Sequence, residues 1–206
     1  SERIPCWNRN VGVFNFSGVA FHGTHHPEEP GDITHIVHRD TGTTAVLPHR
    51  LVLTMSDIES GACWIDYNGH LNMAYYNVIF DHGVDHFYDL LNVGAAYASS
   101  GVGSCFTLEV HLHYVQELKL GDEVEVRLQL LDFDHKRLHY YQEMYHCTDG
   151  YLAATSEQIA LHVDMTSRRS APFPADVTNK LSDVLAAHQG LPRSERIGHS
   201  IGIRRS

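Results

Sequence analysis

The chain has 206 residues, of which 43% are hydrophobic and 19% charged, and its formal net charge at pH 7 is −10. This composition is typical of a globular domain with short extensions, and no apolar run approaches the ~20 residues of a membrane-spanning helix. The negative charge argues against a general nucleic-acid-binding protein, because such proteins carry basic surfaces. We therefore expect neither a membrane nor a nucleic acid as partner.

The cysteines indicate a reducing compartment. Cys6, Cys63, Cys105 and Cys147 are widely separated and form no C-x-x-C pair. Such spacing predicts reduced thiols rather than a disulfide framework. No signal peptide is apparent, so a cytoplasmic location is expected.

The first segment, residues 1–46, gives only weak patterns. Short strands are predicted at residues 11–16 and 18–22, and a hairpin at residues 34–47. We interpret this segment as an N-terminal extension, to which the pattern assigns no role.

A clear β-α-β-β-β-β pattern occupies residues 47–170. Residues 50–58 predict a first strand and residues 72–92 a long helix, with Asn72 as a suitable N-cap and Gly94 as a stop signal. The predicted helix has one apolar stripe with residues at steps of three and four: Tyr76, Phe80, Gly83, Phe87 and Leu90.

Strongly alternating runs follow the helix, and short turns join them. They cover residues 107–114, 123–130, 138–146 and 153–163. Four sequential strands predict an antiparallel meander, against which the helix must bury its stripe. We therefore assign residues 47–170 to one α+β domain.

The last segment, residues 171–206, predicts a short helix and a tail. Pro172 and Pro174 separate it from the last strand, and residues 175–188 read as an amphipathic helix that Gly190 ends. The arginine-containing residues that follow predict a flexible basic tail.

The motif ahead of the long helix carries the chemistry. Asp66-Tyr67-Asn68-Gly69-His70-Leu71-Asn72 combines a lone carboxylate, a glycine turn, an imidazole and a capping amide. A helix N-terminus presents unpaired N–H groups and a partial positive charge. A carboxylate beside such donors suits attack on a carbonyl whose oxygen becomes negative.

This pattern resembles a known family. One long helix wrapped by a curved antiparallel sheet is the hotdog arrangement. Asp66, Gly69, His70 and Asn72, with Tyr76 one turn into the helix, resemble the motif of acyl-CoA thioesterases of the 4-hydroxybenzoyl-CoA thioesterase type. The resemblance covers residues 47–165 and implies the hotdog fold and thioester hydrolysis.

A narrower likeness comes from the end of the domain. Residues 153–158, 161–164 and 168–172 resemble the betainyl-CoA thioesterases of carnitine degradation. Some of these are fused behind a carnitine dehydrogenase domain. This chain has no G-x-G-x-x-G stretch for such a domain.

The family resemblance implies a role for each motif residue. Asp66 would attack the thioester carbonyl or activate a water molecule. His70 would orient Asp66 or transfer protons directly, and Asn72 would cap the helix and fix the N–H groups that polarise the thioester oxygen. Gly69 would permit close approach of the substrate to the backbone. Tyr76 would pack in the core or line the substrate site.

Further residues are candidates for substrate binding. Glu157 is either a solvated residue of the last strand or a second carboxylate of the acyl pocket. Aromatic rings flank the motif and would favour a cationic acyl group, or else pack in the core: Trp64, Tyr67 and Tyr75. The local basic residues are candidates for the phosphates of CoA: Arg168, Arg169, Lys136 and Arg137.

The 17 histidines raise the question of a metal site. His22, His25 and His26 fall in the weakly patterned segment, and His111 and His113 share one strand face. No cysteine or carboxylate stands at ligand spacing from them, so we expect no metal site.

The sequence thus predicts an acyl-CoA thioesterase that hydrolyses a short acyl-CoA, with betainyl-CoA as the candidate substrate. It would need no cofactor, CoA being part of the substrate. It would form a homodimer or higher oligomer through a sheet edge. The alternatives are a non-catalytic acyl-CoA-binding sensor and a thioesterase for aromatic or medium-chain acyl-CoA. A hotdog dehydratase is disfavoured, because the Asp66 motif is intact.

Overall fold

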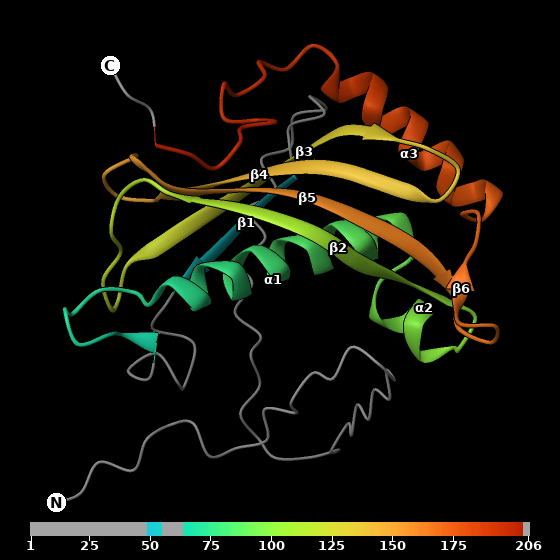
Figure 1. Cartoon of the computed structure of the whole chain (residues 1–206), viewed down its shortest axis with the longest axis horizontal. Helices are drawn as coiled ribbons and strands as arrows, with labels where there is room; N and C mark the ends of the chain where they lie inside the picture. Colours follow the sequence, from blue (N-terminus) through green and yellow to red (C-terminus); the bar gives the residue numbers. More distant parts are fainter. Residues whose placement is uncertain (1–48, 55–63, 204–206) are drawn as a thin grey trace, which may run out of the picture. The chain divides into compact units, whose positions relative to one another are not determined.

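A long helix crosses one face of a curved antiparallel sheet (Figure 1). A computed structural model of the chain describes residues 49–54 and 64–203. Its elements are, in order, β1 (His49–Thr54), α1 (Met73–Leu91), α2 (Ala95–Ser99), β2 (Gly103–Tyr114), β3 (Glu123–Phe133), β4 (Arg137–His146), β5 (Leu152–Asp164), β6 (Arg169–Ser170) and α3 (Ala175–His188). The predicted N-terminal extension and residues 55–58 of the predicted first strand lie outside the described residues.

The sheet has the strand order β1-β3-β4-β5-β2, and β6 pairs with β5. Strands β3, β4 and β5 form the predicted meander, but β2 pairs with β5 instead of with β3. The reason lies in residues 115–122, which are too long for a tight hairpin and pass over the start of α1. There the Leu71 N–H donates to the Leu118 carbonyl at 2.7 Å. The crossing therefore brings the end of β2 beside the motif.

Helix α1 begins and ends close to the predicted residues. The Asn72 side chain accepts a hydrogen bond from the Ala74 N–H at 3.0 Å, which makes Asn72 the N-cap. The helix ends at Asn92, whose φ of 65° is left-handed, so Asn92 supplies the stop expected from Gly94. Gly94 instead precedes the short helix α2.

The apolar stripe of α1 packs on the sheet. Tyr76, Phe80, Gly83 and Phe87 are buried as predicted, whereas Leu90 is exposed. The buried face turns slightly with the helix, which brings Ile79, Val84, Tyr88 and Leu91 inward. Gly83 allows the closest approach, because a Cβ atom there would lie 2.7 Å from the Gln142 side chain.

Strand β2 is a long edge strand with solvent-exposed apolar residues. The sequence predicts one apolar face, yet Leu108, Val110 and Tyr114 are all exposed. A bulge between Thr107 and Glu109 shifts the register, and in the described part of the chain no strand pairs with the outer edge of β2. An edge of this length and composition is suited to pairing with another strand.

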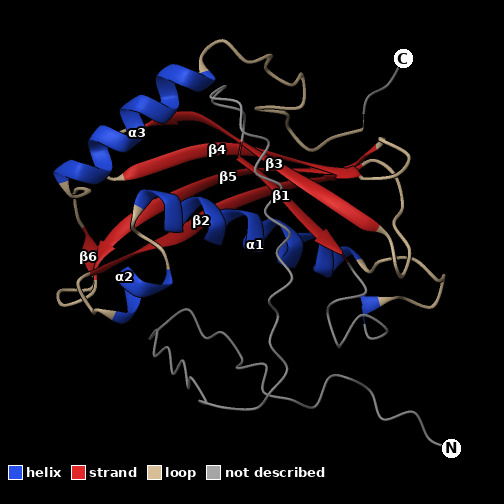
Figure 2. Cartoon of the chain, turned by 180° about the vertical axis from the view of Figure 1, so that it is seen from behind, coloured by secondary structure: helices blue, strands red, loops and turns tan. Residues whose placement is uncertain are grey.

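The C-terminal segment closes the core and then returns over the sheet. Helix α3 covers the predicted residues and packs against β3, where the His188 Nδ1 accepts from the Leu130 N–H at 2.9 Å. Figure 2 shows α3 at the end of the sheet where β3 turns into β4.

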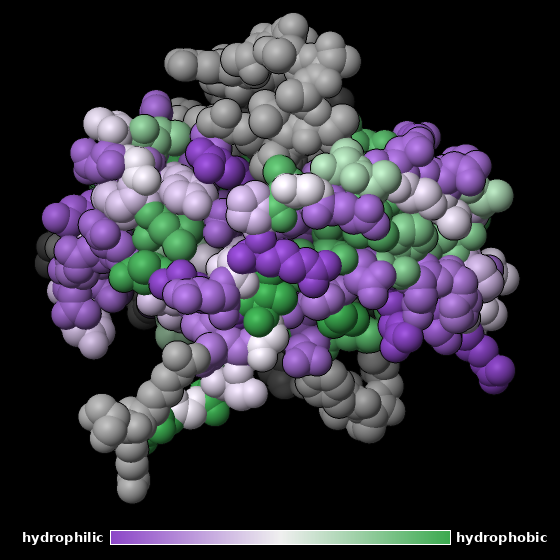
Figure 3. All heavy atoms as spheres, turned by 90° about the horizontal axis from the view of Figure 1, so that it is seen from above, coloured by the Kyte–Doolittle hydropathy of each residue, from purple (hydrophilic) through white to green (hydrophobic). Residues whose placement is uncertain are grey.

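Residues 193–199, here called the C-terminal strap, lie on the face of the sheet opposite α1. The Tyr141 hydroxyl donates to Ser194 Oγ at 3.0 Å, and the Gly198 N–H donates to Glu157 Oε2 at 2.7 Å. This part of the expected flexible tail is therefore held to the sheet. The surface on this side is mainly polar, with small separate hydrophobic patches (Figure 3).

Candidate functional site

The motif ahead of α1 forms a closed loop. Ile65 and Leu71 form an isolated bridge, and the Asp66 N–H donates to the His70 carbonyl at 2.8 Å. Gly69 turns the chain with a φ of +83°, a conformation that favours glycine. No atom crowds the position of its missing Cβ, so this backbone angle is the structural reason for Gly69. The loop fixes Asp66 beside the helix N-terminus.

The Asp66 carboxylate is oriented by backbone donors. Its Oδ1 atom accepts hydrogen bonds from the N–H of Asn68 at 2.7 Å and from the N–H of His70 at 3.3 Å. Partial desolvation favours the neutral acid, but these hydrogen bonds outweigh it and hold the pKa of Asp66 below its usual value. Asp66 is therefore ionised at neutral pH, as a nucleophile or a general base must be.

The His70 side chain pairs with a different acid, Glu117. Its Nε2 atom lies 3.2 Å from Oε2 of Glu117, whereas the hydrogen bonds of His70 with Asp66 are made by its backbone N–H and carbonyl. Glu117 is on the crossing segment after β2, and its carbonyl accepts from the Tyr151 hydroxyl at 2.9 Å. His70 thus holds Glu117 with its side chain and the Asp66 carboxylate with its backbone N–H.

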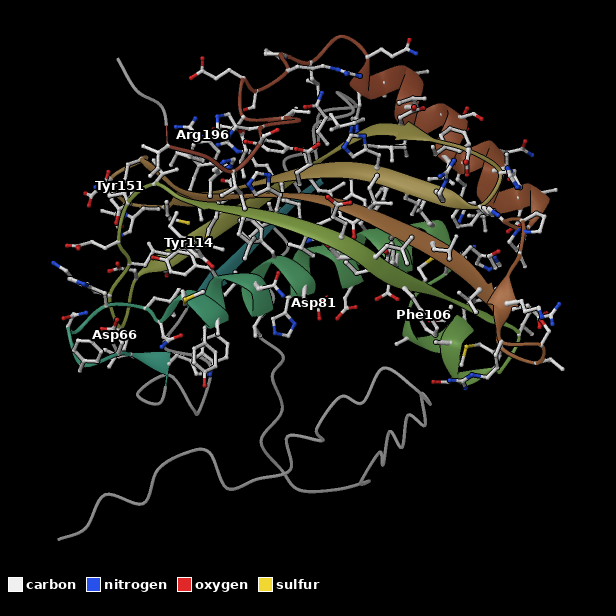
Figure 4. All side chains as sticks on the ribbon, viewed as in Figure 1. Asp66, Asp81, Phe106, Tyr114, Tyr151 and Arg196 are labelled. Carbon is white, nitrogen blue, oxygen red and sulfur yellow. The ribbon has the colours of Figure 1, made fainter. Side chains whose placement is uncertain are left out.

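A pocket of about 300 Å³ opens at this point. Its lining comes from the motif loop, the start of α1 and the end of β2: Asp66, His70, Leu71, Met73, Tyr76, Tyr114, Val115, Gln116 and Glu117. Figure 4 shows Asp66, Tyr114 and Tyr151 at the same end of the sheet. Two carboxylates and no lysine or arginine are among these lining residues, so the pocket is acidic.

Two tyrosines form the inner wall of the pocket. The Tyr76 and Tyr114 rings meet edge to face, with centroids 5.3 Å apart. The Tyr76 hydroxyl accepts from the Leu118 N–H at 3.1 Å, and the Tyr114 hydroxyl donates to the Met73 carbonyl at 3.1 Å. Burial raises the pKa of Tyr76 to about 12 and also raises that of Tyr114. Both phenols are therefore neutral, and Tyr76 serves the core and the pocket together.

The other aromatic candidates do not line this pocket. Trp64 is buried in the core and stacks on Tyr75 with centroids 4.6 Å apart. The Tyr67 side chain is 97% exposed at the tip of the loop. The structure thus favours the core reading for Trp64 and gives Tyr67 no contact with the pocket of this chain.

Glu157 lies on the wrong face of the sheet for the predicted acyl pocket. Its neighbour Gln158 faces α1 and accepts from the Tyr140 hydroxyl, so alternation along β5 turns Glu157 outward. There Glu157 Oε1 lies 2.8 Å from His139 Nε2, and Oε2 accepts from the Gly198 N–H. Glu157 anchors the C-terminal strap.

The four basic candidates for CoA phosphates lie at the far end of the sheet. Lys136 is in the β3–β4 turn and lies 3.5 Å from Ser170 Oγ, while Arg137 pairs with Asp134. Arg168 and Arg169 are exposed at the β5–β6 turn. The twelve-residue strand β2 separates this end from Asp66 by roughly 35 Å. Within one chain these residues do not join the pocket.

Sequence reasoning missed Glu117 and Tyr114 as site residues. Tyr114 is the last residue of an alternating run, and Glu117 follows it in a segment predicted to be a simple connection. Only the crossing of that segment over α1 brings both to Asp66. The length of the connection, eight residues from Val115 to Asp122, was the available signal.

Two further predictions concern metal ions and membranes. Among the residues that the structure describes, no three His, Cys, Asp or Glu side chains form a group that could hold a metal ion. His22, His25 and His26 lie outside the described residues. None of the described helices is long and apolar enough to span a membrane.

Known proteins resemble this chain across the domain that holds the pocket. Residues 61–181 match the family model of the thioesterase-like superfamily. A betainyl-CoA thioesterase of Pseudomonas aeruginosa is 40% identical over 140 residues, which cover 68% of this chain and 88% of that protein. An L-carnitine dehydrogenase/betainyl-CoA thioesterase of Rhizobium meliloti is 35% identical over 153 residues, 74% of this chain but only 31% of that protein.

A solved structure gives the same result for the fold. A hypothetical protein from Staphylococcus aureus, determined in complex with CoA, is 30% identical with a TM-score of 0.68, covering 79% of this chain and all (100%) of that one. These matches and the Asp66 pocket agree with the hotdog fold and thioester hydrolysis that the motif predicts. The chain belongs to the thioesterase-like superfamily and is an acyl-CoA thioesterase.

Proposed function

We propose that this thioesterase hydrolyses betainyl-CoA to betaine and free CoA. The observation that carries the proposal is the acidic pocket, in which Asp66 and Glu117 stand beside neutral aromatic rings. Such a lining favours a cationic acyl group and disfavours an anionic one. The likeness to the betainyl-CoA thioesterase of Pseudomonas aeruginosa supports the same substrate.

Asp66 would carry the chemical step. As a general base, it accepts a proton from water while the water oxygen bonds to the thioester carbon; the C–S bond then breaks and CoA leaves as a thiolate. As a nucleophile, its oxygen bonds to that carbon, CoA leaves as a thiolate, and water then attacks the aspartyl carbonyl carbon of the resulting anhydride, which releases the acid and regenerates Asp66. Single-turnover hydrolysis in ¹⁸O-water separates the two routes, because only the second places the label in Asp66.

The N-terminus of α1 would stabilise the oxyanion. Met73 and Ala74 begin the helix, and Asn72 orders the first turn through its bond to the Ala74 N–H. The positive end of the helix dipole lies beside the pocket, where the carbonyl oxygen gains negative charge. This role would make Asn72 a positioning residue.

The reaction would need no cofactor beyond the CoA of the substrate. Asp66 and water supply the chemistry, and a thiolate is a good leaving group. We further propose a cytoplasmic location, since the four cysteines are widely separated in the sequence and their spacing lacks a disulfide pattern. Unchanged hydrolysis after dialysis against a chelator would agree with cofactor-independent turnover, and loss restored by a metal ion would contradict it.

We also propose a homodimer formed by antiparallel pairing of two β2 edges. Exposed Leu108 and Val110, on a long edge with which no described strand pairs, support it. Light scattering at micromolar concentration should give a dimer, and Val110→Lys should weaken it. A stable monomer with full activity would contradict the proposal.

Such a dimer would explain the distant basic residues. In an antiparallel pair the start of one β2 lies beside the end of the other. The β5–β6 turn adjoins the start of β2, where the Met165 N–H donates to the Val102 carbonyl at 3.2 Å. Arg168 and Arg169 of one subunit would then lie near the Asp66 pocket of the other and bind CoA phosphates. Arg168→Ala with Arg169→Ala should raise KM about tenfold, with a smaller effect on kcat.

The test of the proposed function is thiol release from a panel of acyl-CoA substrates. We expect the highest kcat/KM for betainyl-CoA and a lower value for neutral short, aromatic and medium-chain acyl groups. Saturable binding of all of them without turnover would indicate an acyl-CoA sensor instead. Preference for an aromatic or medium-chain substrate would keep the thioesterase and reject betainyl-CoA.

A further inference from the structure

The geometry points to Glu117 as the residue that selects a quaternary ammonium acyl group in the Asp66 pocket. This inference rests on the proposed betainyl-CoA substrate and names what recognises it. The predicted acidic partner, Glu157, is on the opposite face of the sheet and is bonded to His139 and Gly198. Another carboxylate must therefore supply the selectivity.

The substrate itself limits where that carboxylate can be. In a betainyl thioester one CH₂ group separates the ammonium nitrogen from the reacting carbonyl carbon. From ordinary bond lengths and angles, the two atoms are about 2.5 Å apart. A group that recognises the cation must therefore lie within a few ångströms of the group that attacks the carbonyl. Only residues that share the pocket with Asp66 meet this condition.

Glu117 is the second carboxylate of that pocket. Its Oε2 atom is held 3.2 Å from His70 Nε2, and His70 belongs to the same loop as Asp66. The Tyr151 hydroxyl fixes the Glu117 backbone from the other side. The carboxylate is thus kept at the pocket edge while its side chain remains 55% exposed and open to a ligand.

Tyr114 completes the recognition site. It lines the same pocket, its ring is partly exposed, and its hydroxyl is engaged by the Met73 carbonyl, so the ring position is fixed. Three methyl groups prevent the ammonium from donating a hydrogen bond to Glu117, which leaves charge attraction and ring-face contact as the selective forces. A neutral acyl group of the same shape gains neither.

The experiment uses two substrates of equal shape: betainyl-CoA and 3,3-dimethylbutanoyl-CoA, in which carbon replaces the charged nitrogen. The ratio of their kcat/KM values is measured at low ionic strength for the wild type, Glu117→Gln and Glu157→Gln. We expect Glu117→Gln to lower the ratio about fivefold, since it removes the charge at constant shape. Glu157→Gln, the matched control on the other face, should leave the ratio unchanged.

The outcomes separate the inference from the proposed function. An unchanged ratio in Glu117→Gln, whether both rates persist or fall together, would overturn the role of Glu117 and leave betainyl-CoA as the substrate. A wild-type enzyme that shows no preference for the cationic substrate would reject betainyl-CoA and Glu117 selectivity together. Circular dichroism of each variant verifies that the fold is retained.

Discussion

The two faces of the sheet each carry a carboxylate–histidine pair, and the two pairs differ in what surrounds them. On the face of α1, Glu117 and His70 border an open pocket next to Asp66. On the opposite face, Glu157 binds His139 with one oxygen and the Gly198 N–H with the other, beneath the C-terminal strap. Arg196 lies on this second face (Figure 4).

This difference shows why residue type alone does not identify a site. Both pairs have the composition of an acid–base site. In the pair under the strap both carboxylate oxygens of Glu157 are bonded to groups of the protein, so this pair stabilises the fold. The pair at the pocket has a solvent-accessible acid beside a second acid and a helix N-terminus, so it can meet a substrate.

The largest expected effect is a loss of turnover from a substitution in the pocket on the α1 face of the sheet. Asp66→Asn keeps the shape of the side chain and removes the charge needed for attack or base catalysis, so turnover should fall roughly 10²–10⁴-fold. Steady-state thiol release measures it. Glu157→Gln is the control and should stay within about twofold of the wild-type rate, since it lies outside the pocket. A well-folded Asp66→Asn enzyme with near wild-type turnover would remove Asp66 from the mechanism.

Much of the fold follows from the sequence, since the periodicities are strong. The 3.6-residue stripe and the Asn72 cap predict α1, and the alternating runs predict β3, β4 and β5. The placement of β2 is not predictable in this way, because alternation shows that a run is a strand but not which strand it pairs with. Leu90 is exposed because the buried face of α1 turns along the helix. Leu108 is exposed because it lies on β2, whose outer edge no described strand covers.

Only the part of the site that is contiguous in the sequence could be predicted from it. Asp66, Gly69, His70 and Asn72 are contiguous, so their loop follows from sequence spacing. The sequence left open which face of the sheet Glu157 is on, because the run 153–163 contains small residues on both faces.

The second effect concerns pH. The pKa of Asp66 is lowered below the ordinary aspartate value of 3.8, and the charged form is the active one. As pH falls, kcat/KM should therefore hold until below pH 3.8 and only then decrease tenfold per unit. The pH profile of kcat/KM, with circular dichroism at each pH, measures this. An acid limb above pH 5 in a folded enzyme would indicate that another group controls the rate.

A third expected effect is a loss of stability from a substitution on the face of the sheet beneath the C-terminal strap. Glu157→Gln should lower the free energy of unfolding by about 1–2 kcal/mol, because a partly buried charged acceptor for the Gly198 N–H and His139 is lost. Chemical denaturation measures it. Equal stability of variant and wild type would show that the strap contributes nothing through Glu157.

The smallest expected effects come from removing one hydrogen-bonding side chain on each face of the sheet, Asn72 near the pocket and Ser194 in the C-terminal strap. Asn72→Ala removes the N-cap of α1 and should cost about 1 kcal/mol of stability and also lower kcat, because it loosens the helix start beside the pocket. Ser194→Ala removes the acceptor for Tyr141 at the strap and should cost about 0.5–1 kcal/mol with no change in kcat. If both variants changed kcat alike, the functional separation of the two faces would fail.

The roles of Asp66 and Glu117 are tested most sharply by a crystal structure of the Asp66→Asn variant with unhydrolysed betainyl-CoA. We expect the thioester carbonyl carbon within about 3.5 Å of the side chain at position 66, or one water molecule away from it. We also expect the ammonium group between Glu117 and the Tyr114 ring. An acyl group bound beneath the strap beside Glu157, or any pose that keeps the carbonyl away from position 66, would contradict these roles.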